Sequence, residues 1–203
     1  MTPEFILASN SPRRRELLSM LGMDFKVIVS NCDENIDGDL TPDKLVRELA
    51  LLKAKAVAAT LDASRDYIVI GADTVVCNGA NILGKPQNEA DAKSTLLSLS
   101  GRTHSVWTGV ALVGTHKCIT DAVETKVVFG EISEREAEFY VGTKEPMDKA
   151  GSYAVQGIGG FFVSELCGDY YNVVGLPIAR LRVLLEREFG LSACDYIGKR
   201  RML

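Results

Sequence analysis

A cluster of hydroxyl and guanidinium side chains follows the first apolar segment of the chain. Residues 5–8 are apolar and predict a buried strand, and Ser9, Ser11 and Arg13–Arg15 come directly after it. Ser11 has the sequence position of a helix N-cap, and Pro12 that of the first helical residue. The arginines therefore fall in the first helical turn, where the helix dipole disfavours cations unless an anion binds. The pattern favours a phosphate-binding turn, with a solvated basic turn as the alternative.

A single carboxylate interrupts the most apolar segment of the chain. Asp73 lies between the apolar residues 67–72 and the sequence Thr-Val-Val at 74–76. A carboxylate flanked by apolar strand residues is costly unless it is paired or binds a cation, and ligands of open α/β sheets lie at strand ends. We expect Asp73 at the end of this strand as a catalytic or metal-binding carboxylate, with a turn-forming Asp as the alternative. Gly71 would let a substrate approach the backbone closely.

Three further polar residues have two interpretations each. Lys53 lies on the apolar face of a predicted helix, where an ammonium that extends past packed side chains into solvent is the simpler interpretation. Lys85 stands between a glycine and a proline, as a phosphate contact or an ordinary turn residue. Gln156 interrupts an apolar run before a glycine-rich segment, and its amide could pair with a nucleobase edge or belong to a polar turn.

Composition narrows the class of ligand. The chain has 203 residues and a net charge of -4, so a local arginine cluster favours a small anionic ligand over a long nucleic-acid track. The five cysteines lack CxxC spacing and predict reduced thiols of a cytoplasmic protein, not a zinc site or disulfide framework. There is no long apolar span or signal-peptide pattern, so we expect no membrane partner. The basic tail at 199–203 is interpreted as a frayed terminus.

The elements that must position these residues alternate between strand and helix. Predicted strands cover about 5–9, 25–29, 67–72, 106–113 and 118–129, with a hairpin at 75–83 that turns at Asn78-Gly79. Predicted helices cover 12–22, a long segment after Thr41-Pro42, 89–98, a segment opened by a capping box of Ser133 with Glu136, and 173–189. Residues 150–165 are predicted as strand and glycine-rich turn. In the long helix, the expected buried stripe is Leu45, Leu49, Leu52 and Ala56.

This order of elements predicts an α/β fold with a mixed twisted sheet and flanking helices. We expect one domain over residues 1–203, in which about 87–130 could form a sub-domain. Such a sub-domain would leave a cleft between two lobes, where ligands bind.

Taken together, these motifs resemble the Maf family of house-cleaning nucleoside triphosphate pyrophosphatases. The resemblance covers about residues 5 to 188. It rests on Ser9-x-Ser11-Pro12-Arg13-Arg14, Glu34, Lys53-Ala54, Gly71-Ala72-Asp73-Thr74, Gly84-Lys85-Pro86, Ser100-Gly101-x-x-His104, Asp148-Lys149-Ala150-Gly151 with Gln156-Gly157, and Asn172-Val173-Val174-Gly175-Leu176-Pro177.

The resemblance implies an inosine-triphosphatase-like fold with a deep cleft, and hydrolysis of the α–β phosphoanhydride to a nucleoside monophosphate and pyrophosphate. By motif position, the triphosphate would bind to Ser9, Arg13, Arg14, Lys53 and Lys85. Glu34 and Asp73 would hold a divalent metal, Mg²⁺ or Mn²⁺, and Asp73 would also accept the proton of the attacking water. Glu34, Lys53 and Lys85 would complete the catalytic set. The resemblance thus replaces the solvent-exposed interpretation of Lys53.

Two residues indicate the branch of the family. Thr74 and Gln156 resemble the branch that acts on dTTP and UTP, whereas the 7-methyl-GTP branch has Gln and Glu at these positions. Both residues are therefore expected to contact the substrate base. A 7-methyl-GTP pyrophosphatase and a nucleotide-binding regulator of septum formation are the alternatives. We expect a homodimer that binds a nucleoside triphosphate and no nucleic acid.

Overall fold

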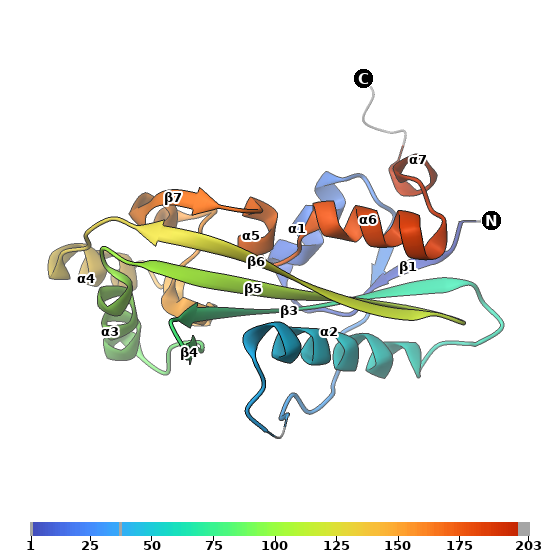
Figure 1. Ribbon diagram of the computed structural model, residues 1–203, viewed down its shortest axis with the longest axis horizontal. Helices are drawn as coiled ribbons and strands as arrows, with labels where there is room; N and C mark the ends of the chain where they lie inside the picture. The colour runs from blue at the N-terminus through green and yellow to red at the C-terminus, as the bar shows by residue number, and fades with distance from the viewer. Residues whose placement is uncertain (1, 37, 199–203) are drawn as a thin grey trace. The chain divides into compact units, whose positions relative to one another are not determined.

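The computed structural model describes residues 2–36 and 38–198 (Figure 1). The strands are β1 (Glu4–Leu7), β2 (Phe25–Val27), β3 (Tyr67–Asn78), β4 (Asn81–Leu83), β5 (Thr103–Gly114), β6 (Cys118–Phe129) and β7 (Val163–Cys167). The helices are α1 (Pro12–Met20), α2 (Pro42–Ala58), α3 (Glu89–Leu99), α4 (Glu134–Gly142), α5 (Tyr170–Val174), α6 (Ile178–Phe189) and α7 (Ala193–Tyr196). Three 3-10 helices are η1 (Glu145–Asp148), η2 (Ala150–Ser152) and η3 (Ile158–Phe162). The basic tail at 199–203 lies outside the described residues.

The strands form a seven-stranded mixed sheet in the order β2-β1-β3-β5-β6-β7, with β4 paired to β3. Strand β1 runs parallel to β2 and β3, whereas the β3–β4 and β6–β7 pairs are antiparallel. The predicted α/β class with a mixed sheet is therefore confirmed. Within the described residues no helix is long and apolar enough to cross a membrane, and all five cysteines are free thiols, as predicted.

The chain divides into two compact units. Unit 1 comprises residues 1–73, 108–123 and 175–203, and unit 2 comprises 74–107 and 124–174. Strands β3, β5 and β6 contribute residues to both units. Neither unit has the boundaries 87–130 that were considered for a sub-domain, and the cleft between lobes stays a prediction.

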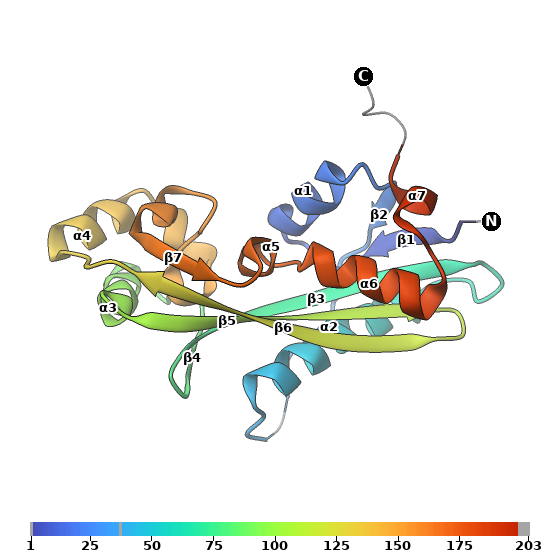
Figure 2. The same cartoon turned by 45° about the horizontal axis from the view of Figure 1, so that its top comes forward.

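Within unit 1, helices α2 and α6 cover opposite faces of the strands (Figures 1 and 2). Helix α2 packs very closely, because Gly71 of β3 faces the backbone of Ala50, and Gly109 of β5 faces the backbone of Val46. A Cβ at either glycine would overlap the helix backbone. The missing side chain of Gly71 therefore allows the close packing of α2. The interpretation that it allows a substrate to approach the backbone is wrong.

The buried face of α2 also differs from the expected stripe. Its buried residues are Val46, Leu49, Ala50, Lys53, Ala54 and Val57. Leu45, Leu52 and Ala56 are only half-buried. The small residues on this face fit the close approach of the strands, whereas leucine side chains would hold the helix away.

Within unit 2, helices α3 and α4 and the 3-10 segments enclose a second core. Tyr140 and Phe129 are its largest fully buried side chains. The predicted capping box of Ser133 and Glu136 opens α4, and Gly79, at φ +61°, turns the predicted β3–β4 hairpin. Both features depend on residues close in sequence, which is why the sequence predicts them.

Three other expectations need correction. Asp73 lies within β3, because the strand continues to Asn78 instead of ending near Ala72. Residues 150–162 form mainly 3-10 helices and turns, and the predicted strand is present only at residues 163–165, where β7 begins. The predicted helix 173–189 is two helices, since Gly175 adopts φ +124° and Pro177 lacks the N–H that a continuous helix would need.

Candidate active site

The turn between β1 and α1 has the geometry that the sequence predicts. Ser11 is the N-cap of α1, and its hydroxyl accepts a hydrogen bond from the N–H of Arg14 at 3.5 Å. Pro12 is the first helical residue. The hydroxyl of Ser9, which is buried, accepts a hydrogen bond from the N–H of Ser11 at 3.2 Å. The first turn of α1 therefore presents arginines on a rigid, serine-capped backbone.

The guanidinium of Arg14 is held in one orientation. Its Nε donates to the carbonyl oxygen of Gly175 at 2.8 Å, and one terminal nitrogen donates to the hydroxyl of Ser9 at 3.2 Å. Burial lowers the pKa of Arg14 below its ordinary value, while the charges of Asp73 and Glu34 act in the opposite direction. Arg14 therefore lies in the electrostatic field of both candidate metal-binding carboxylates.

Lys53 joins these two carboxylates. Its ammonium lies 2.6 Å from Oδ1 of Asp73 and 2.8 Å from Oε2 of Glu34. The Lys53 side chain is 11% exposed, Asp73 is 14% exposed, and Glu34 is 55% exposed. The ammonium is thus paired and largely buried, and the interpretation that it extends into solvent is wrong.

The packing of α2 explains this pairing. Ala50 and Ala54 face Gly71, so Lys53 between them reaches Asp73, which lies two residues further along β3. Glu34 comes from the loop that precedes α2 and reaches the same ammonium from its exposed side. All six predicted site residues of unit 1 belong to this cluster or its turn: Ser9, Arg13, Arg14, Glu34, Lys53 and Asp73.

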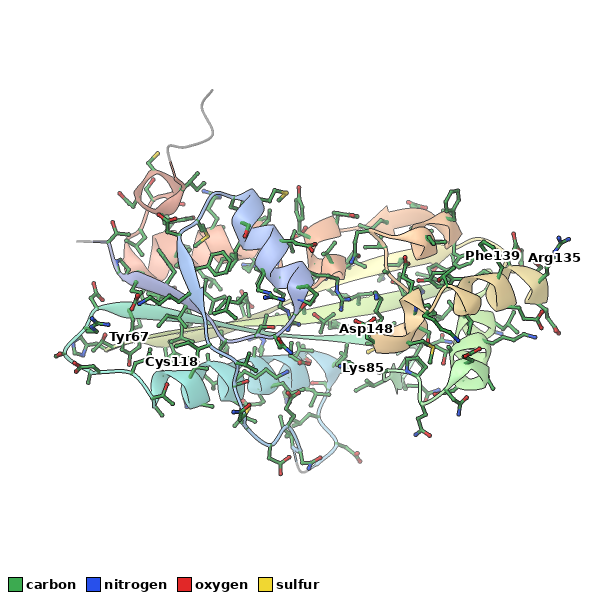
Figure 3. All side chains as sticks on the ribbon, turned by 180° about the vertical axis from the view of Figure 1, so that it is seen from behind. Tyr67, Lys85, Cys118, Arg135, Phe139 and Asp148 are labelled. Carbon is green, nitrogen blue, oxygen red and sulfur yellow. The ribbon has the colours of Figure 1, made fainter. Side chains whose placement is uncertain are left out.

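The remaining predicted site residues belong to unit 2. Thr74 follows Asp73 on β3 and is half-buried. Lys85 is exposed in the loop after β4, and the N–H of Gly151 donates to the carbonyl of Gly84 at 3.1 Å. This bond holds the Lys85 loop beside the segment that carries Asp148, as Figure 3 shows.

Gln156 is exposed in a turn between η2 and η3. The turn is closed by a hydrogen bond from the N–H of Gly157 to the carbonyl of Ala154 at 3.2 Å. The predicted polar turn is therefore present, and the amide of Gln156 lies on its surface. This placement is compatible with both earlier interpretations of Gln156.

The profile of the Maf-like protein family matches residues 4–188, which is most of the chain. The chain belongs to this family. A dTTP/UTP pyrophosphatase of Bacillus thuringiensis subsp. konkukian is 53% identical over 178 residues, which cover 88% of this chain and 92% of the relative. A dTTP/UTP pyrophosphatase of Bacillus cytotoxicus is 52% identical over 190 residues, which cover 93% and 98% of the two chains.

A solved structure supports the fold. The Staphylococcus aureus Ham1 protein matches with a TM-score of 0.50 over 91% of this chain and 99% of that chain, at 16% identity. At this identity the likeness concerns architecture alone. It agrees with the mixed α/β sheet that the order of the predicted elements indicated.

The donor set of this Maf-like protein can be tested for a divalent metal. Glu34 and Asp73 supply carboxylate oxygens, the ligands that Mg²⁺ and Mn²⁺ prefer. No group of three or more His, Cys, Asp or Glu side chains suited to a metal occurs in the described part of the chain. In this structure the Lys53 ammonium contacts one oxygen of each carboxylate. Two carboxylates still fit Mg²⁺, which binds proteins through one or two carboxylates and takes its other ligands from water and substrate phosphates.

Sequence reasoning missed one structural partner of the site. The carbonyl of Gly175 fixes Arg14, across 161 positions of sequence. The signal was present in the motif Asn172-Val173-Val174-Gly175-Leu176-Pro177, whose glycine and proline interrupt a predicted helix. A carbonyl exposed by such a break is available to an arginine.

Proposed function

We propose that this chain is a nucleoside triphosphate pyrophosphatase that hydrolyses the α–β phosphoanhydride of dTTP and UTP. The proposal is carried by the Lys53 ammonium bound between Asp73 and Glu34, in the field of Arg14. Identities of 52–53% to relatives named dTTP/UTP pyrophosphatases support the same activity and substrates.

The cations of the site bind the phosphate chain in this proposal. Arg13, Arg14 and Lys53 neutralise phosphate oxygens, and Lys85 adds a further cation. The hydroxyl of Ser9 keeps the Arg14 fork pointed in one direction. Fixed donors stabilise the charge that develops on the leaving pyrophosphate without reorganisation during the reaction.

Asp73 accepts the proton of the attacking water. The water oxygen bonds to phosphorus, the bridging P–O bond breaks, and the products are the nucleoside monophosphate and pyrophosphate. A divalent metal held by Glu34 and Asp73 would supply charge neutralisation and a lowered pKa of water when bound. A positioned general base of this kind contributes about 10²–10⁴-fold to the rate.

The base is recognised by Gln156 and Thr74. An amide carries both a donor and an acceptor, which suits the alternating groups of uracil and thymine. A carboxylate could not donate to their carbonyl oxygens. The 7-methyl-GTP alternative therefore predicts a different residue at position 156. We further propose that the protein acts in the cytoplasm and forms a homodimer.

Pyrophosphate release tests the proposal with dTTP, UTP, CTP, ATP, GTP and 7-methyl-GTP in Mg²⁺ or Mn²⁺. We expect the highest kcat/KM for dTTP and UTP, and a loss of about 10²–10⁴-fold in kcat for Asp73→Asn. Asp24→Asn, which changes an exposed carboxylate of unit 1, is the matched control and should keep wild-type rates. A preference for 7-methyl-GTP, or a fully active Asp73→Asn enzyme, would contradict the proposal.

A further inference from the structure

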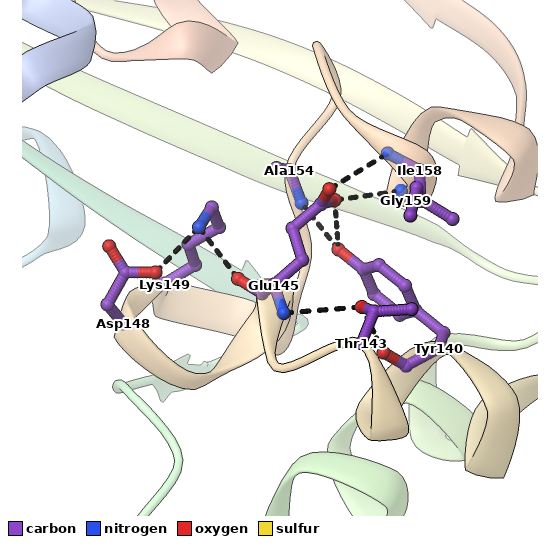
Figure 4. A network of polar contacts seen from close by, with 8 residues as sticks. All are labelled: Tyr140, Thr143, Glu145, Asp148, Lys149, Ala154, Ile158 and Gly159. Carbon is purple, nitrogen blue, oxygen red and sulfur yellow. Dashed lines mark hydrogen bonds and ion pairs between the residues drawn. The ribbon is translucent and has the colours of Figure 1, made fainter.

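The turn that carries Gln156 is attached to a carboxylate of the same unit. Glu145 accepts hydrogen bonds from the N–H groups of Ile158 and Gly159, each at 3.1 Å (Figure 4). Its Oε1 also accepts a hydrogen bond from the hydroxyl of Tyr140 at 2.8 Å. One side chain thus fixes two consecutive backbone groups immediately after the turn.

The glycines of this segment make room for that carboxylate. A Cβ at Gly157 would lie 2.5 Å from the carboxylate oxygens of Glu145. A Cβ at Gly159 would lie 2.6 Å from the Tyr140 hydroxyl and about 3 Å from the backbone of Ala154. Glycine-rich backbone with consecutive N–H donors commonly binds phosphate. Here the same arrangement binds an internal carboxylate.

Tyr140 attaches the other end of the turn. Its ring is fully buried, and its hydroxyl accepts a hydrogen bond from the N–H of Ala154 at 3.1 Å while it donates to Glu145. Residues 154 and 158–159, on either side of Gln156, are therefore connected through one phenol and one carboxylate. This arrangement leaves the backbone of Gln156 little freedom to move.

The carboxylate of Glu145 is itself well fixed. Burial raises its pKa, but the N–H donors of Gly159 and Ile158 and the hydroxyl of Tyr140 outweigh burial, and the pKa lies below its ordinary value. The ammonium of Lys149 donates to the main-chain carbonyl of Glu145 at 2.7 Å and to Asp148 at 2.6 Å. Lys149 therefore holds the backbone from which Glu145 extends.

We propose that Glu145, supported by Tyr140, is a positioning residue that fixes the Gln156 amide for recognition of the pyrimidine. The inference rests on the proposed function, because it assigns base recognition to Gln156. The side chain of Glu145 bonds to Tyr140 and to the backbone of Ile158 and Gly159, which flank the Gln156 turn. We therefore expect its effect on base selectivity and not on phosphate binding.

The test separates base recognition from phosphate binding. The variants are Glu145→Gln, which removes one acceptor from the paired N–H groups, and Tyr140→Phe, which removes the hydroxyl. Glu138→Gln is the matched control, because Glu138 is an exposed carboxylate on α4 that pairs with Lys93. The measurements are kcat/KM for dTTP, UTP and GTP, and the Ki of inorganic triphosphate, which has no base.

We expect Glu145→Gln and Tyr140→Phe to lower the ratio of kcat/KM for dTTP over GTP by about tenfold, the worth of one lost hydrogen bond. The Ki of triphosphate should stay within about twofold of the wild type. In a Gln156→Ala background the same substitutions should leave the ratio unchanged, because the group that they position is gone. Glu138→Gln should match the wild type in every measurement.

Three outcomes would overturn the inference. The first is an unchanged ratio of kcat/KM for dTTP over GTP in both variants. The second is an equal loss in dTTP, GTP and triphosphate binding, which would make Glu145 a purely structural residue. The third is a fall in the dTTP-over-GTP ratio that is as large in the Gln156→Ala background as in the wild type. If Gln156→Ala alone keeps the wild-type ratio, base recognition by Gln156 fails as well. If Glu145→Gln does not fold, Tyr140→Phe gives the same comparison.

Discussion

The ammonium nitrogen of Lys53 lies 2.6 Å from Oδ1 of Asp73, with both side chains at least 86% shielded from solvent. An ion pair with this little water contact is held by packing as much as by charge. Removing either partner leaves the other as a largely buried charge that has lost an ion-pair partner, which lowers the free energy of unfolding. The pair is therefore a structural element of the protein, in addition to the catalytic role that we propose for it.

The two substitutions Lys53→Met and Asp73→Asn should be strongly coupled in stability. Each alone should lower the free energy of unfolding, and the double variant should lose less than the sum, with a coupling energy of about 1–3 kcal/mol. Urea unfolding of the four proteins gives this value. Losses that add within about 0.5 kcal/mol would show that the pair is energetically independent.

Arg14 and Arg15, both in the first turn of α1, should differ in pyrophosphate binding. Pyrophosphate with Mg²⁺ should raise the Tm of the wild type and of Arg15→Ala more than that of Arg14→Ala, because a ligand that binds the folded state more tightly stabilises it more. Arg15 is the matched control, since it is exposed in the same turn. Equal shifts in all three proteins would place the phosphates away from Arg14.

Glu34 should control metal affinity with little effect on stability. Its side chain is more than half exposed, so Glu34→Gln should unfold at nearly the wild-type temperature. Calorimetric titration of Mn²⁺ in the presence of pyrophosphate should show an affinity about tenfold weaker than that of the wild type. Asp33→Asn, one residue earlier, is the control, and superimposable titrations of the two variants would remove Glu34 from the metal site.

His104 should make the fold sensitive to acid. Burial lowers the pKa of His104 from 6.5 to about 4, and its Nε2 pairs with the Tyr153 hydroxyl at 2.8 Å. The His104 imidazole binds a proton more readily in the unfolded chain than in the folded chain. The contribution of neutral His104 to the free energy of unfolding is therefore complete above pH 6.5 and is lost as the pH falls toward 4. The loss is about 3 kcal/mol, at 1.36 kcal/mol per pKa unit.

The measurement is the free energy of unfolding at pH 7.5 and at pH 4.5 for the wild type and His104→Gln. The glutamine keeps a polar contact for Tyr153 but does not titrate in this range. The difference between the two pH values should therefore be smaller in the variant. An identical difference would assign the acid sensitivity to other groups.

Features that depend on neighbouring residues were predictable from the sequence. The Ser11 cap, the Gly79 hairpin turn and the Ser133 capping box each use groups within a few positions of one another. The break before α6 had a local signal too, because Pro177 lies inside the predicted helix 173–189, but the prediction did not use it.

Features that depend on distant partners were not predictable by pattern. The environment of Lys53 is set by Asp73, 20 positions later, and by the glycine contact that brings α2 against β3. The segment 150–165 was expected to be strand and glycine-rich turn, and only its end, residues 163–165, forms strand by pairing with β6. Before it, the N–H groups of Ile158 and Gly159 bond to the side chain of Glu145 in place of a neighbouring strand. In both cases tertiary contacts override local propensity.

Gly71 and Gly109 have a consequence for protein engineering. Replacing a glycine by alanine is a common route to a more thermostable protein where φ is negative. Neither glycine is among those with positive φ, so a choice based on backbone angles would select both. A methyl group at either position would meet the α2 backbone and push the helix away, carrying the Lys53 ammonium with it. Thermostabilised variants of this enzyme should therefore keep both glycines.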